Sequence, residues 1–211
     1  MLFYIAFAIL FIPMAILFPT KVIHKERMPK RGKKCIATSN HYSNVDPILY
    51  NKLFVRKFRF MAKKELFNTK FKSFILKGIG AFPVDRENIT PSVFKKTIGE
   101  LNQNHQVFIF PEGTRNKEGS EQMGDAKMGV ITFASKGDAE IVPMIIYAKP
   151  RVFRKNYVIV GEPFKVVGEN PKRLTKEESE ENLKIYTKKM EDLRKEIDEF
   201  VSSKKRKKNS K

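Results

Sequence analysis

The sequence predicts an α/β domain with a mostly parallel central sheet flanked by helices, an N-terminal membrane-anchoring helix and a C-terminal amphipathic helix. Short apolar runs alternate with helical patterns between residues 35 and 160. Residues 1–20 carry no charge, and after residue 175 apolar residues recur three and four positions apart. We therefore divide the chain into an anchor (1–20), an α/β domain (21–174) and a C-terminal helix with a basic tail (175–211).

The first 20 residues are apolar except for Pro13, Pro19 and Thr20. As a helix they would be about 30 Å long, which is enough to cross a bilayer. A secretory signal peptide fits least well, because the positive charge before the apolar stretch and the small-residue cleavage site after it are both missing. A spanning helix and a monotopic anchor kinked at Pro13 both remain open.

The net charge of +19 on 211 residues indicates an anionic partner, which can be nucleic acid, a membrane surface or a phosphorylated substrate. Residues 21–34, 52–77 and 204–208 together account for all of it. A basic RNA-binding or membrane-binding protein without activity is one interpretation. Aromatic stacking platforms interleaved with base-reading side chains are not evident, so no nucleic acid is expected. The apolar N-terminus favours anionic membrane lipids, with the domain at the cytoplasmic face of the cell membrane.

The domain elements are expected in a fixed order along the chain. The sequence predicts strands at 35–39, 58–62, 106–110, 140–147 and 157–160, and helices at 48–55, 66–77, 91–103 and about 127–136. Thr90 as N-cap and Pro91 at N1 open the third of these helices, and Gly137 closes the last. The helix at 66–77 places Phe67, Phe71, Phe74 and Ile75 on one face among lysines, so either core packing or contact with lipid is possible.

The C-terminal helix is expected to cover about seven turns. Thr175 and Glu178 form a capping box at its start. Its apolar face comprises Leu183, Tyr186, Met190, Leu193, Ile197 and Phe200. Because three heptads are marginal for a coiled coil, this face is expected to pack on the domain or on membrane.

A His–Asp pair follows the strand at 35–39. His41 and Asp46 are five positions apart in Asn40–Asp46, and either one helical turn or a tight loop would bring them together. Pro47 is expected to prevent helical geometry at Asp46. A neutral imidazole can take a proton from an alcohol while a carboxylate fixes its tautomer, so the pair predicts general-base catalysis.

A second polar motif, Glu112–Arg115, follows the strand at 106–110. Active sites of parallel sheets lie beyond the carboxyl ends of the strands, so this motif and His41 are expected in one crevice. No metal site is predicted, because the chain has a single cysteine, Cys35, in an apolar run and no zinc-binding motif. Nor does the stretch at 78–83 match a dinucleotide-binding loop, because Pro83 stands where the third glycine belongs.

Four ordered blocks resemble the glycerolipid acyltransferase family, in particular its bacterial 1-acylglycerol-3-phosphate acyltransferases. The blocks are N-H-x-x-x-x-D at 40–46, glycine-x-phenylalanine leading to an arginine at 80–86, F-P-E-G-T-R at 110–115 and an apolar stretch around a proline at 141–145. Asn116 departs from the serine that usually follows the third block, and only one apolar segment precedes the first.

The resemblance implies transfer of an acyl group from a thioester, of coenzyme A or acyl carrier protein, to the hydroxyl of lysophosphatidate, giving phosphatidate for phospholipid synthesis. Glycerol 3-phosphate or another lysophospholipid is an alternative acceptor. It implies that His41 is the base and Asp46 its orienting partner, without a further cofactor. The expected substrate-binding residues are Lys63, Arg86, Glu112, Gly113, Thr114 and Arg115. No G-x-S-x-G elbow is present, so direct transfer is expected.

Overall fold

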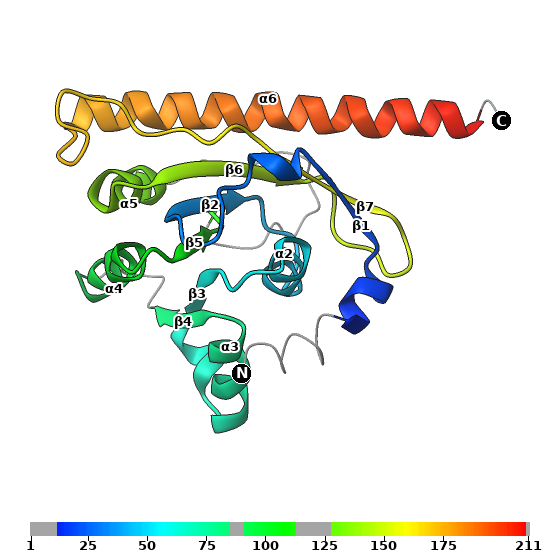
Figure 1. Ribbon diagram of the computed structural model, residues 1–211, viewed down its shortest axis with the longest axis horizontal. Helices are drawn as coiled ribbons and strands as arrows, with labels where there is room; N and C mark the ends of the chain where they lie inside the picture. The colour runs from blue at the N-terminus through cyan, green and yellow to red at the C-terminus, as the bar shows by residue number, and fades with distance from the viewer. Residues whose placement is uncertain (1–11, 85–90, 113–127, 210–211) are drawn as a thin grey trace.

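The computed structural model describes residues 12–84, 91–112 and 128–209. It contains a seven-stranded sheet with the strand order β1-β7-β6-β2-β5-β3-β4 (Figure 1). The strands are β1 (Thr20–Ile23), β2 (Cys35–Ser39), β3 (Arg59–Lys63), β4 (Ala81–Val84), β5 (Gln106–Ile109), β6 (Glu140–Ile146) and β7 (Asn156–Val160). All neighbouring pairs are parallel except β6 with β7, so β1 and β7 run opposite to the other five strands. The prediction of a mostly parallel sheet is confirmed.

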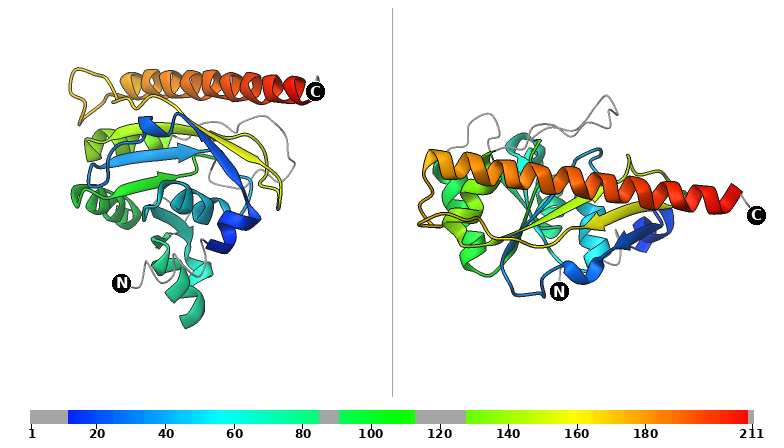
Figure 2. Two further views of the ribbon diagram at one scale, coloured as in Figure 1. Left: turned by 45° about the vertical axis from the view of Figure 1, so that its right-hand side comes forward. Right: turned by 90° about the horizontal axis from the view of Figure 1, so that it is seen from above.

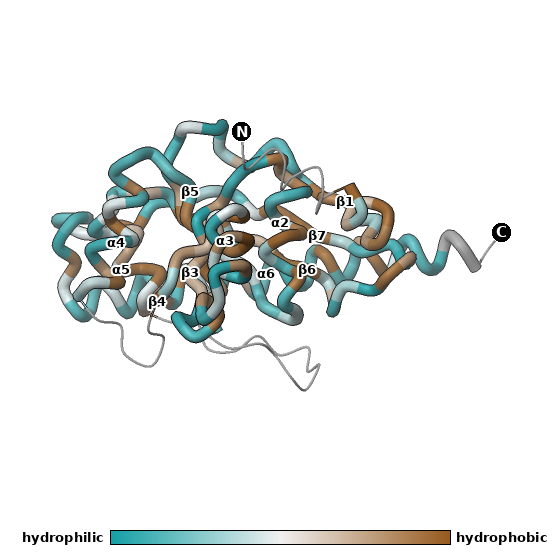
Figure 3. The backbone as a smooth tube through the Cα atoms, turned by 90° about the horizontal axis from the view of Figure 1, so that it is seen from below, coloured by the Kyte–Doolittle hydropathy of each residue, from teal (hydrophilic) through white to brown (hydrophobic). Residues whose placement is uncertain are grey.

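Helices cover both faces of this sheet. They are α2 (Asp46–Phe54), α3 (Lys70–Gly78), α4 (Pro91–Asn102), α5 (Met128–Gly137) and α6 (Lys176–Asn209), with short 3₁₀ turns η1 (Lys25–Arg27) and η2 (Lys64–Phe67). Alternate residues of β2 point to opposite faces: Ala37 packs in one apolar cluster with α2, and Ile36 in the other with α4, α5 and α6. In Figure 3 the hydrophobic colour concentrates on the central strands, as this two-sided burial requires.

The C-terminal helix packs on the domain, one of the two arrangements that the sequence left open. Both views in Figure 2 show α6 lying along the outside of the sheet. Tyr186, Met190, Leu193, Ile197 and Val201 of α6 are buried in the second apolar cluster. The capping box is confirmed, because Thr175 N donates to Glu178 Oε2 at 2.7 Å and Glu178 N donates to Thr175 Oγ1 at 3.1 Å. The helix has 34 residues, which is longer than expected because it continues through the basic segment.

The N-terminal segment also contacts the domain. Residues 12–17 are helical, and Met14 and Phe18 are buried in the cluster around α2. Ile12 and Ile16, on the other side of this turn, are exposed. Within the described ranges no helix is both long and apolar enough to span a bilayer.

Several local expectations are wrong. Asp46 is the first residue of α2 rather than excluded from it: Pro47 sits in the first turn, where its missing N–H needs no partner. The helix expected at 66–77 is divided into η2 and α3, and Thr69 caps α3 by accepting from Lys72 N. Gly137, the expected C-cap of the helix at about 127–136, is the last residue of α5, and the left-handed residue that follows the helix is Asp138. Thr90, the expected cap of α4, lies outside the described residues.

Candidate active site

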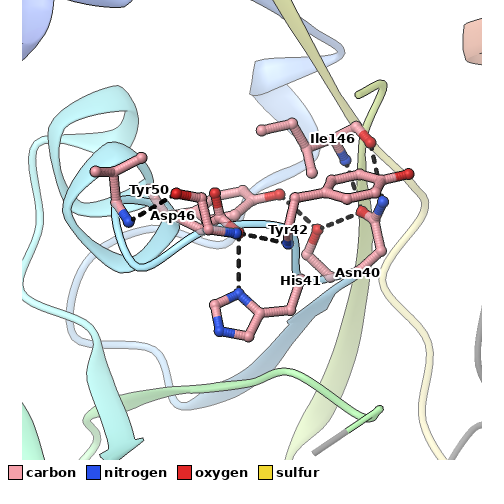
Figure 4. Close-up of polar contacts among 9 residues, drawn as sticks. Asn40, His41, Tyr42, Asp46, Tyr50 and Ile146 are labelled. Carbon is pink, nitrogen blue, oxygen red and sulfur yellow. Dashed lines mark hydrogen bonds and ion pairs between the residues drawn. The ribbon is translucent and has the colours of Figure 1, made fainter. Parts of the chain in front are cut away.

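The His–Asp pair lies in the loop between β2 and α2. His41 Nδ1 is 2.9 Å from Asp46 Oδ2, and the same oxygen accepts hydrogen bonds from the backbone N–H groups of Tyr42 and Ser43, each at 2.8 Å (Figure 4). A carboxylate only accepts, so Nδ1 carries the proton and Nε2 of a neutral ring is an acceptor. Asp46 is fully buried and His41 nearly so. A tight loop, one of the two geometries left open by the sequence, therefore produces the pair.

Phe110 fixes the imidazole from the neighbouring strand. It follows β5, which is parallel to β2, and its ring stacks on His41 with centroids 4.0 Å apart and planes 20° apart. This contact brings the first and third sequence blocks together, which confirms that the two strand ends meet. Sequence reasoning assigned no role to Phe110, although its place two residues before Glu112 could have suggested one.

Asn40 ties the loop to the other side of the sheet. Its side chain donates to Ile146 O at 3.0 Å and accepts from Ile146 N at 2.9 Å, so the ends of β2 and β6 are joined. Ser39 Oγ donates to Asn40 Oδ1 at 3.1 Å and lies 2.5 Å from the Tyr50 hydroxyl of α2. Burial, and secondarily the charge of Asp46, raises the pKa of Tyr50 well above its ordinary value, so this phenol stays protonated. The network holds His41 between rigid elements.

The structure places two of the expected substrate-binding residues. Lys63 is exposed at the carboxyl end of β3, which pairs with β5, and Glu112 is half-buried two residues beyond Phe110. Burial, with the charge of Glu112 as a smaller cause, raises the pKa of the Tyr186 phenol above its ordinary value. Arg86, Gly113, Thr114 and Arg115 lie outside the described residues.

The described part of the chain holds no group of three or more His, Cys, Asp or Glu side chains that could bind a metal ion. Cys35 is buried in β2, and burial raises the pKa of its thiol to about 12. It is a small apolar core residue, as the sequence predicts.

Fold and site together define the class of protein. A doubly covered parallel sheet carries, at its carboxyl edge, a buried His–Asp pair whose free nitrogen can accept a proton. The family model described as Acyltransferase matches residues 20–147, and the chain belongs to this family. The match contains the His–Asp loop, Lys63, Phe110 and Glu112, and ends one residue after β6.

The chain is similar to several proteins named as acyltransferases that act on 1-acylglycerol phosphate. The chain is 39% identical over 150 residues to 1-acyl-sn-glycerol-3-phosphate acyltransferase of Bacillus subtilis, covering 68% of this chain and 72% of the relative. It is 30% identical over 139 residues to the protein of that name from Borreliella burgdorferi, covering 65% of this chain and 54% of the relative. The crystal structure of the 1-acyl-sn-glycerophosphate (LPA) acyltransferase PlsC from Thermotoga maritima has the same fold, with a TM-score of 0.63 and 23% identity over 86% of this chain and 72% of that one.

Proposed function

We propose that the protein moves a fatty acyl group from a thioester to the free hydroxyl of 1-acylglycerol 3-phosphate, giving phosphatidate. The observation that carries this proposal is the buried His41–Asp46 pair stacked on Phe110, the first residue of F-P-E-G-T-R. The relatives named for this reaction support the choice of acceptor. A base without an adjacent enzyme nucleophile suits direct transfer to an alcohol.

In the proposed step, Nε2 of His41 takes the proton of the acceptor hydroxyl as its oxygen attacks the thioester carbonyl. The new C–O bond forms, the C–S bond breaks, and the imidazolium returns the proton to the departing thiolate. Asp46 keeps the ring in the required tautomer and stabilises its charged form. The thiol carrier, coenzyme A or acyl carrier protein, is a co-substrate, and no other cofactor is needed.

We assign the acceptor phosphate to cationic side chains at or beyond the ends of neighbouring strands: Lys63 at the end of β3, Arg86 after β4 and Arg115 after β5. Guanidinium groups form paired hydrogen bonds with phosphate oxygens. Gly113 and Thr114 would bring backbone and hydroxyl groups to the ligand, and Glu112 would bond the glycerol or support an arginine. Three cations facing one phosphate should reject acceptors that lack it.

We also place the protein on the cytoplasmic face of the cell membrane, with residues 1–20 as an anchor. The uncharged N-terminal segment and the adjoining basic flank support this location. Exposed Ile12 and Ile16 on the turn that packs through Met14 and Phe18 give the segment an apolar outer side. The amphiphilic acceptor then reaches the site from the lipid phase.

A thiol-release assay with purified protein tests the reaction. Lysophosphatidate, glycerol 3-phosphate, another lysophospholipid and monoacylglycerol would be compared with acyl-coenzyme A and acyl carrier protein donors. We expect lysophosphatidate to be preferred over monoacylglycerol by about 10⁴. His41→Ala should lower turnover by about 10²–10⁴ without changing the fold. The matched control His24→Ala removes a half-exposed histidine paired with Glu26 and Glu196 and should retain activity.

Comparable rates on both acceptors would exclude the phosphate pocket. Near-normal turnover by His41→Ala would show that His41 is not the catalytic base. Salt-sensitive RNA binding with no thiol release would instead support a binding protein.

A further inference from the structure

The loop between β6 and β7 exposes apolar side chains beside cations. Phe153 is 71% exposed and Val152 is 48% exposed. Residues 147–156 contain no acidic residue. Four exposed cations surround the two apolar residues: Lys149, Arg151, Arg154 and Lys155. The loop begins where the match to the family model ends, at residue 147, so family membership does not assign it a role.

This exposure is built into the loop by specific hydrogen bonds. The buried Asn156 side chain accepts from Arg151 N at 2.9 Å and donates to Arg154 O at 2.9 Å and Arg151 O at 3.2 Å. Phe153 N donates to Leu17 O at 2.7 Å, and Asn156 N donates to Pro19 O at 2.8 Å. Phe153 itself has φ 54°, a left-handed conformation that is unusual for a bulky residue. The loop is therefore held with an aromatic ring outward, and packing inside the described protein does not account for it.

The loop lies at the catalytic edge of the sheet. It starts directly after β6, whose last residue Ile146 is bonded to Asn40, the neighbour of His41. Because β1 and β7 run opposite to β6, the residues before β1 reach the same edge. Figure 1 shows the 147–156 loop beside the N-terminal helical turn, where Ile12 and Ile16 are exposed. One edge thus combines the His–Asp pair with exposed apolar and cationic side chains.

We propose that the β6–β7 loop docks on the surface of an anionic lipid bilayer. Phe153 and Val152 enter the headgroup boundary, while the four cations contact lipid phosphates. A bilayer fits better than a protein partner because the charge is of one sign and the loop continues the apolar outer side of residues 12–17. The consequence for catalysis rests on the proposed function: the loop would hold the His41 edge at the surface where an amphiphilic acceptor resides.

Single-tryptophan variants test the docking in the full chain, which contains no tryptophan of its own. Phe153→Trp places the probe in the loop. Val167→Trp is the control, because Val167 is 57% exposed and follows β7 at the opposite edge of the sheet, where β6 begins. Vesicles of phosphatidylglycerol with brominated acyl chains quench tryptophan that enters the bilayer. We expect a blue shift and strong quenching for Phe153→Trp and weak quenching for Val167→Trp. Quenching of Phe153→Trp no stronger than that of Val167→Trp would overturn the proposal.

A charge test uses Arg151→Ser with Arg154→Ser, compared with Arg173→Ser and Lys176→Ser, two exposed cations at or just before the start of α6. Loss of each cation near the surface should weaken binding to phosphatidylglycerol vesicles about fivefold, and binding to phosphatidylcholine vesicles should change little. The loop pair should lose clearly more affinity than the control pair, and equal losses would contradict the proposal. The loop variants should acylate a monomeric short-chain acceptor normally but a vesicle-bound acceptor slowly. An intact protein inactive on both acceptors would refute the proposed function without affecting the quenching result.

Discussion

At the scale of single residues, one oxygen of Asp46 organises the site. Asp46 Oδ2 receives the imidazole and two backbone N–H groups, so the same atom orients the base and shapes the loop. This coupling explains why the two residues need the spacing they have. The loop between them must be long enough to turn back, and short enough for Tyr42 and Ser43 to reach the carboxylate.

Asp46→Asn should disturb orientation more than folding. All three hydrogen bonds end on one oxygen. An amide oxygen in its place is neutral and stabilises the imidazolium less, and an amide nitrogen in its place cannot accept from Nδ1, which disfavours the tautomer with a free Nε2. We expect kcat to fall by about 10²–10⁴ with a smaller change in KM. A kcat equal to that of the unaltered protein would contradict this role.

Cys35 should make the protein less stable at alkaline pH. Burial raises the pKa of its thiol from 9.0 to about 12, so between these values the unfolded chain loses the proton and the folded chain keeps it. The unfolded state then binds fewer protons, and the free energy of unfolding falls as pH rises, by up to ~1.4 kcal/mol per pH unit. Well below pH 9 the thiol is protonated in both states, so it does not make the free energy of unfolding depend on pH. Urea unfolding of Cys35→Ala should show a shallower decline than the unaltered protein between pH 9 and 10.5, and parallel declines would be evidence against this.

At the scale of elements, the apolar runs of the inner strands are readable in the sequence. β2, β5 and β6 are buried on both faces, so each is a continuous apolar run that predicts a strand. β1 and β4 were not predicted. Each lies at an edge of the sheet with a single partner, β7 or β3, and Pro83 in β4 lacks a backbone N–H for the ladder, which weakens the strand pattern of that segment.

Only the part of the site that depends on local sequence could be predicted. The spacing of His41 and Asp46 is local and can be read from the chain. The bonds of Asn40 to Ile146, and the stacking of Phe110 on His41, join residues 106 and 69 positions apart. Such contacts depend on strand order, which local patterns do not contain.

Replacing Ile197 tests whether α6 is part of the core. It is fully buried between the helix and the sheet, so Ile197→Ala should lower the free energy of unfolding by about 2–5 kcal/mol. Ile16→Ala is a matched control at a 67% exposed position and should change it by less than about 0.5 kcal/mol. Chemical denaturation measures both. If Ile197→Ala lowered the free energy of unfolding only slightly, α6 would be held on the domain only at its ends.

At the scale of the whole molecule, positive charge and exposed apolar residues occur outside the inner sheet. Exposed large hydrophobic residues are found in residues 12–17, in η2 and α3, and in the β6–β7 loop. Leu66, Phe71 and Phe74 are exposed and do not pack in the core, whereas Phe67 does, and contact of the exposed residues with lipid stays a prediction. The basic segments at 21–34 and 52–77 adjoin or contain several of these residues. This distribution fits a protein that works against an anionic surface.

Two truncations separate anchoring from folding at the N-terminus. Removing residues 1–11 leaves Met14 and Phe18 in the core, whereas removing residues 1–18 deletes both side chains from the cluster around α2. Truncating either side chain alone costs about 2–5 kcal/mol, so deleting residues 1–18 should lower Tm strongly and deleting residues 1–11 should lower it little.

The protein that lacks residues 1–11 should shift partly to the soluble fraction. It should leave membranes fully only at high salt, because the basic surface still attracts anionic lipid. Fractionation at two salt concentrations, with thermal unfolding of both proteins, measures this. If the protein that lacks residues 1–11 is fully soluble at low salt, the rest of the surface does not bind membrane. If the two truncated proteins have equal Tm values, residues 12–18 do not stabilise the domain.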